Sequence, residues 1–287
     1  MQKASNWLLD HASDTYSQAG EDGVIAAILS LIGAPDRWCV EFGAWDGLHL
    51  SNTRRLISEQ GYSAVLIEGD RAKWNELKRN YADNPRVSAV NAMVGFRAED
   101  GLDSILSRCD IPRDFDFLSI DIDGNDYHVW KRVEAYRPKV VCVEFNPSMP
   151  NEVHFVQPAD PRVKQGASLS ALADLAREKR YELVCALHAN AFFVDSPYFA
   201  RFGIADNSPA RVRQNLSTVT WLFSGFDGTV HLAGHRYLPW HGIELRERAM
   251  QSLPRLLRKF PDDYSKVRSV LFRALRKWRS LRNPRKS

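Results

Sequence analysis

Four side chains that can offer oxygen atoms as metal ligands lie at or just after the ends of two predicted strands. One buried strand ends at Asp121, with Asp123 two residues later, and another ends at Glu144, with Asn146 two residues later. Residues two apart on a strand share a face, and the carboxyl ends of neighbouring parallel strands meet at one edge of a sheet, so we expect the four to converge. Such a cluster can hold Mg²⁺ or another divalent metal. The alternative is that it caps helices or binds a polar substrate directly.

Without a metal, a carboxylate or a histidine must accept a proton. His128 and His154 are the histidine candidates, because imidazole titrates near neutral pH. A loop histidine more often has a structural role. Asp121, Asp123, His128 and His154 are therefore the candidate catalytic residues.

A glycine-rich turn follows an earlier predicted strand. Residues 40–47 read Val-Glu-Phe-Gly-Ala-Trp-Asp-Gly, and glycines at a strand end let the backbone approach a ligand closely. The dinucleotide pattern GxGxxG and the Walker lysine pattern are absent from the sequence. The acid Glu41 is a poor neighbour for a pyrophosphate, but it suits the cationic methionine end of S-adenosylmethionine (SAM). The alternative is that Glu41 and Asp46 only cap the next helix.

The next two predicted strands end in residues suited to an adenosine. Glu68 and Gly69 lie about twenty residues after the turn, and a carboxylate there can accept both ribose hydroxyls. A helix N-cap is the alternative role, and it fits Asp70 better than Glu68. Asn91 and Ala92 offer the polar group and the small residue that an adenine edge needs, although a buried turn asparagine is equally consistent.

The chain resembles the FkbM-like family of class I SAM-dependent methyltransferases over roughly residues 15–195. The segments that carry the resemblance are 17–22, 40–47, 51–53, 67–70, 119–124, 143–147, 166–169 and 190–194. The resemblance implies a seven-stranded SAM-binding fold and O-methyl transfer, often to sugars or polyketide-type products. It implies SAM-binding roles for Gly43, Asp46 and Glu68, and the family is too broad for it to imply an acceptor.

The residues and the resemblance together define a candidate SAM site. It consists of Glu41, Gly43, Ala44, Asp46, Gly47, Asn52, Glu68, Gly69, Asn91, Ala92 and Asp121. The candidate metal ligands, Asp121, Asp123, Glu144 and Asn146, resemble the acid–acid–Asn arrangement of metal-dependent catechol and sugar O-methyltransferases. A metal there orients the acceptor hydroxyl and lowers its pKa. Without it, Asp121 is expected to contact the SAM amino group.

Alternating strands and helices must position these residues. We expect strands at 38–42, 63–68, 87–92, 115–121 and 139–144, and helices at 17–32, 51–60, 71–81, 101–108 and 127–136. This alternation predicts an α/β fold, with a doubly wound, Rossmann-like, seven-stranded mixed sheet. A helix at 168–179 precedes strands at 181–187 and 191–194, which predict a terminal antiparallel hairpin. Residues 195–245 show no clear pattern.

Composition places the chain among soluble globular proteins. Apolar residues make up 44% of its 287 residues and charged residues 26%. The sequence has neither a run of eighteen apolar residues nor the features of a secretory signal at its start, so we expect a cytoplasmic location. Its four cysteines form no CxxC pair, which predicts reduced, buried thiols and argues against zinc.

Positive charge is concentrated in the last segment of the chain. Residues 246–287 contain 14 Lys or Arg and 3 Asp or Glu, a net charge of +11, whereas the remainder carries −7. We therefore expect a SAM-dependent methyltransferase domain at 1–245 and a basic amphipathic helical tail at 246–287. The tail suits an anionic membrane surface, such as the inner membrane face. It can also pack on its own domain or on a second copy in a homo-oligomer. Nucleic acid is less suitable, because the acids at the site repel phosphate.

Three functions are consistent with these features. The first is a SAM-dependent methyltransferase that methylates a sugar hydroxyl on a glycan or lipid-linked saccharide, as in polysaccharide biosynthesis. The second is an RNA or protein methyltransferase that holds its substrate with the basic tail. The third is a non-catalytic SAM-fold interaction module. The set of Gly43, Asp46 and Glu68 argues against the third.

Overall fold

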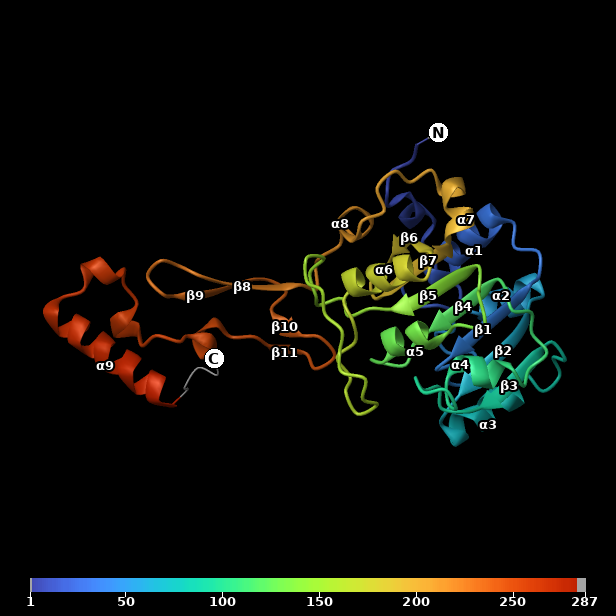
Figure 1. Cartoon of the computed structure of the whole chain (residues 1–287), viewed down its shortest axis with the longest axis horizontal. Helices are drawn as coiled ribbons and strands as arrows, with labels where there is room; N and C mark the ends of the chain where they lie inside the picture. Colours follow the sequence, from blue (N-terminus) through green and yellow to red (C-terminus); the bar gives the residue numbers. More distant parts are fainter. Residues whose placement is uncertain (1, 283–287) are drawn as a thin grey trace. The chain divides into compact units, whose positions relative to one another are not determined.

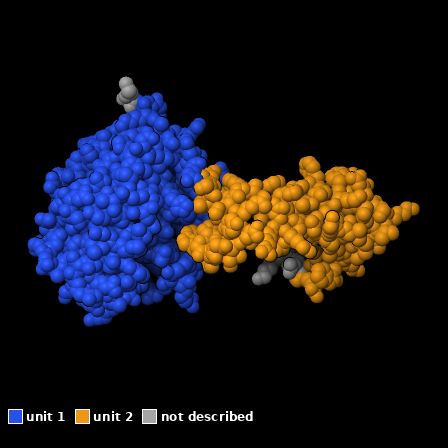
Figure 2. Space-filling view, turned by 180° about the vertical axis from the view of Figure 1, so that it is seen from behind, with its two compact units in different colours: residues 1–215 blue, residues 216–287 orange. Residues whose placement is uncertain are grey.

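The computed structural model describes residues 2–282 and divides the chain into two compact units, Met1–Asn215 and Leu216–Ser287 (Figure 2). The division lies earlier in the chain than the boundary expected between residues 245 and 246. The reason is that two hairpins after residue 215 form small sheets of their own and do not join the main sheet.

A seven-stranded sheet forms the centre of the first unit, with the order β3-β2-β1-β4-β5-β7-β6 (Figure 1). The strands are β1 Trp38–Phe42, β2 Ser63–Glu68, β3 Val87–Asn91, β4 Phe117–Ile120, β5 Val140–Glu144, β6 Tyr181–Ala186 and β7 Asn190–Asp195. Strands β1 to β5 pair in parallel, and β7 runs antiparallel to both β5 and β6. The predicted doubly wound mixed sheet with a terminal antiparallel hairpin is confirmed.

Helices cover both faces of this sheet. On one face lie α1 Glu21–Ile32, α2 Arg54–Gln60 and α3 Arg71–Asn80, and on the other lie α4 Leu102–Leu106, α5 Asp126–Arg132 and α6 Leu169–Glu178. Alternate side chains of each strand serve the two cores, so Val40 and Phe42 pack toward α4–α6 whereas Cys39 packs toward α1–α3. Burial on both faces explains why the strands read as continuous apolar runs.

Several helices are shorter than the sequence predicts. The helix expected from residue 17 begins at Glu21, because the Asp22 carboxylate accepts hydrogen bonds from the backbone amides of residues 15, 16 and 17 and folds them into a loop. The helix expected from Ser51 begins at Arg54. Hydrogen bonds from the preceding backbone to the Asp22 carboxylate thus set the first of these starts, which apolar periodicity did not locate.

The rest of the first unit is made of short elements. They are η1 Trp7–His11, α7 Ser196–Phe199, η2 Ala200–Phe202 and α8 Pro209–Val212. All four cysteines are free, and Cys39, Cys142 and Cys185 are buried.

The second unit consists of two hairpins, three short helical turns and one long helix. The hairpins are β8 Thr220–Ser224 with β9 Val230–Gly234, and β10 Tyr237–Leu238 with β11 Ile243–Glu244. The turns η3 Glu247–Met250, η4 Arg255–Leu257 and η5 Pro261–Asp263 precede α9 Lys266–Arg282. This long helix is where the basic helical tail was expected, and residues 283–287 of that tail lie outside the described residues. Across residues 2–282, no helix combines the length and the apolar character that crossing a bilayer requires.

Candidate functional site

The candidate site lies at the carboxyl ends of the parallel strands. The chain passes outward from β1 to β2 and β3, and then crosses back to β4 on the other side of β1. At such a reversal the loops after the two central strands leave in opposite directions, and ligands of open α/β sheets bind in the crevice between them. The ends of β1 to β5 and the segments that follow them carry most of the residues singled out from the sequence.

The turn after β1 is fixed by close contact with its neighbours. Gly43 has φ +72°, and a Cβ atom there would lie 2.0 Å from the carbonyl oxygen of Asp121. The amide of Ala44 donates to the carbonyl of Ile67 at 3.2 Å. Gly47 also has positive φ, but a side chain there would meet Leu77 of α3. Packing therefore requires both glycines, and Gly43 is the one that brings the turn against β4.

Glu41 holds the segment before α2. Its buried carboxylate accepts hydrogen bonds from the hydroxyls of Ser51 and Thr53, both at 2.6 Å, and from the amide of Asn52 at 2.9 Å. Burial raises its pKa, and these hydrogen bonds oppose the rise. The Asn52 side chain donates to Ser119 Oγ at 3.0 Å. Glu41 therefore fixes the segment before α2 rather than the first turn of the helix, and its role in SAM binding stays a prediction.

Glu68 links the turns after β1 and β2. One carboxylate oxygen accepts from the amide of Trp45 at 2.8 Å, and the other accepts from the amide of Asp70 at 2.7 Å. Glu68 is only 8% exposed. A carboxylate has about four acceptor positions, so each oxygen retains capacity after these two bonds. Sequence reasoning passed over Trp45, whose amide fixes one of these oxygens.

Two other acids at the site stabilise turns. Asp46 Oδ1 accepts from the amides of Leu48 and His49 at 2.9 and 2.8 Å. Asp70 is the N-cap of α3 and accepts from the amides of residues 72 and 73. Asp46 thus fixes a turn that precedes α2, and its role in SAM binding stays a prediction, whereas Asp70 takes the N-cap role that the sequence favoured for it.

Asn91 lies beside Glu68 across the β2–β3 pair. Its side-chain nitrogen donates to the carbonyls of Glu68 at 2.8 Å and Gly69 at 3.3 Å, and the amide of Ala92 donates to the Glu68 carbonyl at 3.2 Å. These bonds fix the orientation of the amide group. Its side-chain oxygen receives no hydrogen bond from residues 2–282. A polar acceptor is thus held at the end of β3.

Three of the four oxygen-bearing residues converge. Ile120 pairs with Val143, so Asp121 and Glu144 are the next neighbours at the ends of β4 and β5. One carboxylate oxygen from each of Asp121, Asp123 and Glu144 lies within 4.8 Å of the other two. Asp123 is exposed, whereas the other two are partly buried. The predicted convergence of these three acids is confirmed.

Asn146 has other partners. Its side-chain nitrogen donates to the carbonyl of Gln165 at 2.8 Å, and its oxygen accepts from the amide and the hydroxyl of Ser148 at 2.9 and 2.6 Å. Both ends of the amide thus hold the loop between β5 and α6. The suggested role of Asn146 as a metal ligand competes with these contacts.

Burial and like charge make Asp121 and Glu144 retain protons to higher pH. Burial, followed by repulsion from Asp126 and Asp123, raises the pKa of Asp121 to about 7. Burial, followed by repulsion from Asp121, raises the pKa of Glu144 to about 9, and Lys164 opposes this rise. Raised carboxyl pKa values are typical of groups that exchange protons near neutral pH.

Asp126 organises the loop that carries Asp121 and Asp123. Its buried carboxylate accepts from the amides of Ile122 and Gly124, both at 2.9 Å, and burial raises its pKa to about 6. Sequence reasoning gave Asp126 no separate role, although an acid at the first residue of a helix is a capping signal.

Lys164 is a further residue that the sequence did not single out. Its Nζ atom lies 3.5 Å from Oδ2 of Asp123. Lys164 belongs to the loop between β5 and α6, whose position no sequence pattern predicted.

The two histidines lie in other environments. His128 Nε2 is 2.8 Å from the carbonyl oxygen of Gln157, and its ring packs against Tyr127. His154 Nε2 is 3.2 Å from an Asp174 oxygen, and its side chain is 57% exposed. Within residues 2–282, neither imidazole forms a hydrogen bond with the acidic cluster. Each imidazole therefore contacts groups outside the acidic cluster, and a role as general base stays a prediction for both.

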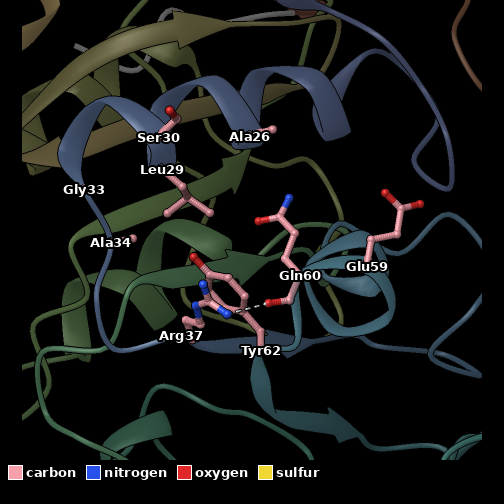
Figure 3. Close-up of a pocket in the computed structure, with 9 residues that line it drawn as sticks. All are labelled: Ala26, Leu29, Ser30, Gly33, Ala34, Arg37, Glu59, Gln60 and Tyr62. Carbon is pink, nitrogen blue, oxygen red and sulfur yellow. Dashed lines mark hydrogen bonds between the residues drawn. The ribbon is translucent and has the colours of Figure 1, made fainter.

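A separate pocket of about 540 Å³ lies at the opposite edge of the sheet (Figure 3). Arg37 and Tyr62, which immediately precede β1 and β2, form part of its lining with Gly33 at the end of α1. Figure 3 shows the Arg37 guanidinium donating to the carbonyl oxygen of Gln60, at 3.4 Å. None of the candidate site residues lines this pocket.

No protein-family model matches this chain, and no curated relative does. The FkbM-like resemblance therefore stays a prediction. Among solved structures, the chain is similar to the METTL16 MTase domain, with 14% identity, 60% of this chain and 66% of that chain covered, and a TM-score of 0.40. The matched region thus spans just under two thirds of that domain.

Two further solved structures show comparable similarity. One is an O-methyltransferase from Bacillus cereus in complex with SAH, with 19% identity, 66% and 85% coverage and a TM-score of 0.42. The other is a SAM-dependent methyltransferase from Aquifex aeolicus, with 11% identity, 59% and 87% coverage and a TM-score of 0.35.

Proposed function

We propose that this chain is a SAM-dependent methyltransferase whose cofactor binds at the carboxyl ends of β1 to β4. The observation that carries the proposal is the position of the Glu68 carboxylate. It lies at the tip of β2, and the amides of Trp45 and Asp70 hold its two oxygens in place. Both oxygens can still accept hydrogen bonds, as two neighbouring ribose hydroxyls require.

The neighbouring groups fit the rest of the cofactor. The fixed side-chain oxygen of Asn91 can accept a hydrogen bond from the adenine amino group, and Ala92 leaves room at the adenine edge. Asp121 offers a carboxylate whose pKa is raised by burial and repulsion, so a cationic partner stabilises its charged form. We assign the ammonium contact to Asp121 rather than to Glu41, because the Glu41 carboxylate already accepts three hydrogen bonds from residues 51–53.

The acidic cluster supplies the proton acceptor. When bound, SAM supplies an activated methyl group. Glu144 in its ionised form takes the proton of an acceptor hydroxyl, and Asp121 beside it stabilises the protonated form of Glu144 by like-charge repulsion. Asp126 keeps the loop of Asp121 in position through the amides of Ile122 and Gly124.

The acceptor that suits this site best is a sugar hydroxyl, on a glycan or a lipid-linked saccharide. Closely spaced carboxylates can accept hydrogen bonds from neighbouring hydroxyls of one sugar ring. The same negative charges repel the phosphates of RNA, which disfavours an RNA acceptor.

A divalent metal is the alternative use of the same carboxylates. Asp121, Asp123 and Glu144 would hold it, since their oxygens lie within 4.8 Å of one another and carboxylates suit Mg²⁺. It would orient the acceptor hydroxyl and lower its pKa. We favour the carboxylate as base, because the single amide oxygen of Asn146 already accepts two hydrogen bonds from Ser148 and is not free to complete the metal-ligand set.

Two assays test the proposed function. The first measures the melting temperature of the full chain with SAM, with S-adenosylhomocysteine, and with ATP as a control for nonspecific adenosine binding. We expect the first two to raise it and ATP to leave it unchanged; an equal effect of all three would refute a dedicated SAM site. The second measures S-adenosylhomocysteine release with panels of free saccharides, nucleotide sugars, RNA and peptides. Turnover with RNA or peptides alone would refute the sugar assignment.

A further inference from the structure

Helix α9, Lys266–Arg282, has two apolar surfaces, and only one of them is packed. On the packed side, the ring of Phe272 lies 5.5 Å from the ring of Tyr264, whose hydroxyl donates to the carbonyl of Leu257 at 2.6 Å. Arg279 on the same side donates to the carbonyl of Ser252. These contacts fasten the helix to the turns that precede it.

The second apolar surface is exposed. We call it the exposed stripe, and it consists of Val267, Val270, Leu271, Trp278 and Leu281, which are 69%, 56%, 43%, 49% and 74% exposed. The later four lie three, four, eleven and fourteen residues after Val267, which places all five along one side of an α-helix. Aliphatic and aromatic side chains left in water at this density favour a partner that covers them.

Positive charge borders the exposed stripe. Helix α9 contains seven Lys or Arg residues and no Asp or Glu. At 100° per residue, Lys266, Arg273 and Lys277 lie along one border of the stripe and Arg282 along the other. The guanidinium of Arg282 lies 4.2 Å from the centre of the Trp278 ring. Long basic side chains beside an apolar stripe can place their charges in a headgroup layer while their stems cover apolar surface.

This combination fits one kind of partner. A second copy of α9 would bring seven further positive charges against the first helix, which repulsion opposes. A nucleic acid would pair with the cations but would leave the aliphatic residues of the stripe uncovered. An anionic lipid surface suits both the cations and the exposed stripe, because its headgroups attract the cations and its acyl boundary takes up the stripe.

We propose that α9 binds the surface of an anionic phospholipid membrane, with the exposed stripe at the acyl boundary and the bordering Lys and Arg residues among the headgroups. The helix lies along the surface, since no helix in residues 2–282 is long and apolar enough to cross a bilayer. The proposal does not rest on methyl transfer. Vesicle binding and SAM binding are separate readouts, so either can fail alone.

Flotation of the full chain with vesicles tests this proposal. One set contains phosphatidylcholine alone, and the other contains a one-third mole fraction of phosphatidylglycerol. We expect binding to the anionic vesicles, little binding to the neutral ones, and weakening at high salt. Equal binding to both vesicle types, or binding to neither, would overturn the proposal.

Two double variants separate the contributions of the stripe and of charge. Val270→Asp with Trp278→Asp changes exposed side chains only, so the fold is expected to survive, and vesicle binding is expected to fall at least about tenfold. Arg273→Glu with Lys277→Glu is expected to produce a loss of at least about the same size, since each basic residue contributes about 1 kcal/mol at an anionic surface.

The matched control is Lys78→Glu with Arg108→Glu, which makes the same change in net charge on exposed residues of the first unit. We expect this variant to retain more binding than the α9 charge variant. An equal loss in both would show that net charge, and not α9, determines binding. Light scattering without lipid completes the test. If the wild-type chain forms a dimer and the Val270→Asp, Trp278→Asp variant is a monomer, the exposed stripe serves self-association and the proposal is overturned.

Discussion

Asp121 and Glu144 hold carboxylate oxygens within 4.8 Å of each other at the ends of the neighbouring strands β4 and β5. Burial raises the pKa of each, and repulsion from Asp121 raises the pKa of Glu144 further. Bringing two partly buried acids together destabilises the fold unless a proton or a cation is present. The arrangement therefore favours a reaction in which one of these carboxylates takes up a proton, and methyl transfer to a hydroxyl releases one.

Glu144→Gln is expected to separate activity from stability. It removes the proposed base, so the turnover rate with the best acceptor should fall about 10² to 10⁴-fold. It also removes an ionisation that burial opposes, so it should raise the free energy of unfolding more at about pH 8 than at about pH 5. We expect the two increases to differ by at least roughly 1.4 kcal/mol, which is the value of one pKa unit. Steady-state kinetics and urea unfolding measure the two effects.

The control for Glu144→Gln is Asp123→Asn, in the same cluster but on a side chain that is 75% exposed. We expect a much smaller change in both measurements. If Glu144→Gln kept full turnover while Asp123→Asn abolished it, the base would have to be reassigned.

The stability of the wild-type protein should decrease as pH rises. The folded-state pKa values of Asp126, Asp121 and Glu144 are raised to about 6, 7 and 9. Unfolded carboxyls titrate near pH 4, so between about pH 4 and about pH 9 the folded state binds more protons than the unfolded state. The contribution of these groups is fully present below that window and is lost through it. Melting temperatures across the window should fall less in Glu144→Gln, and parallel curves for the two proteins would contradict the assigned burial.

Gly43→Ala tests the close approach of the β1 turn to β4. Gly43 and Gly61 have similar φ values, +72° and +70°, but an added Cβ meets the Asp121 carbonyl oxygen at 2.0 Å in the first case and nothing within 4 Å in the second. Gly61→Ala should therefore cost only the backbone strain, about 1–2 kcal/mol. Gly43→Ala should cost roughly 1–3 kcal/mol more in urea unfolding. Equal costs would mean that the turn is looser than described.

Chelation distinguishes the carboxylate base from a metal. Because the raised pKa values of Asp121 and Glu144 already provide a proton acceptor, turnover should survive thorough treatment with EDTA and should not depend on added Mg²⁺. Loss of activity on chelation, with recovery on adding Mg²⁺, would instead assign these carboxylates to a metal.

The sheet was predictable from the sequence because its strands are buried on both faces and so appear as short apolar runs between helices. The ends of the helices were less predictable. Residues 15–17 and 51–53 form hydrogen bonds to the carboxylates of Asp22 and Glu41, respectively. Apolar periodicity does not predict such contacts.

The site was predictable to the extent that strand ends determine it. Asp121, Asp123 and Glu144 converge because parallel strands end at one edge. The partners of Asn146 come from a loop without periodicity, so its contacts with Ser148 and Gln165 could not be foreseen. The hairpins of residues 220–244 were missed for a related reason, since most side chains of β8 are exposed and show no alternation.

The most direct test of the account is calorimetric titration of the full chain with S-adenosylhomocysteine, using Glu68→Gln and Asp70→Asn as paired variants. Asp70→Asn keeps an N-cap for α3, whereas Glu68→Gln loses the charge that accepts the ribose hydroxyls. The account predicts one site per chain in the wild type, unchanged affinity in Asp70→Asn, and affinity about 10 to 100-fold weaker in Glu68→Gln. Absence of binding to the folded wild-type chain, or equal affinity in all three proteins, would contradict it.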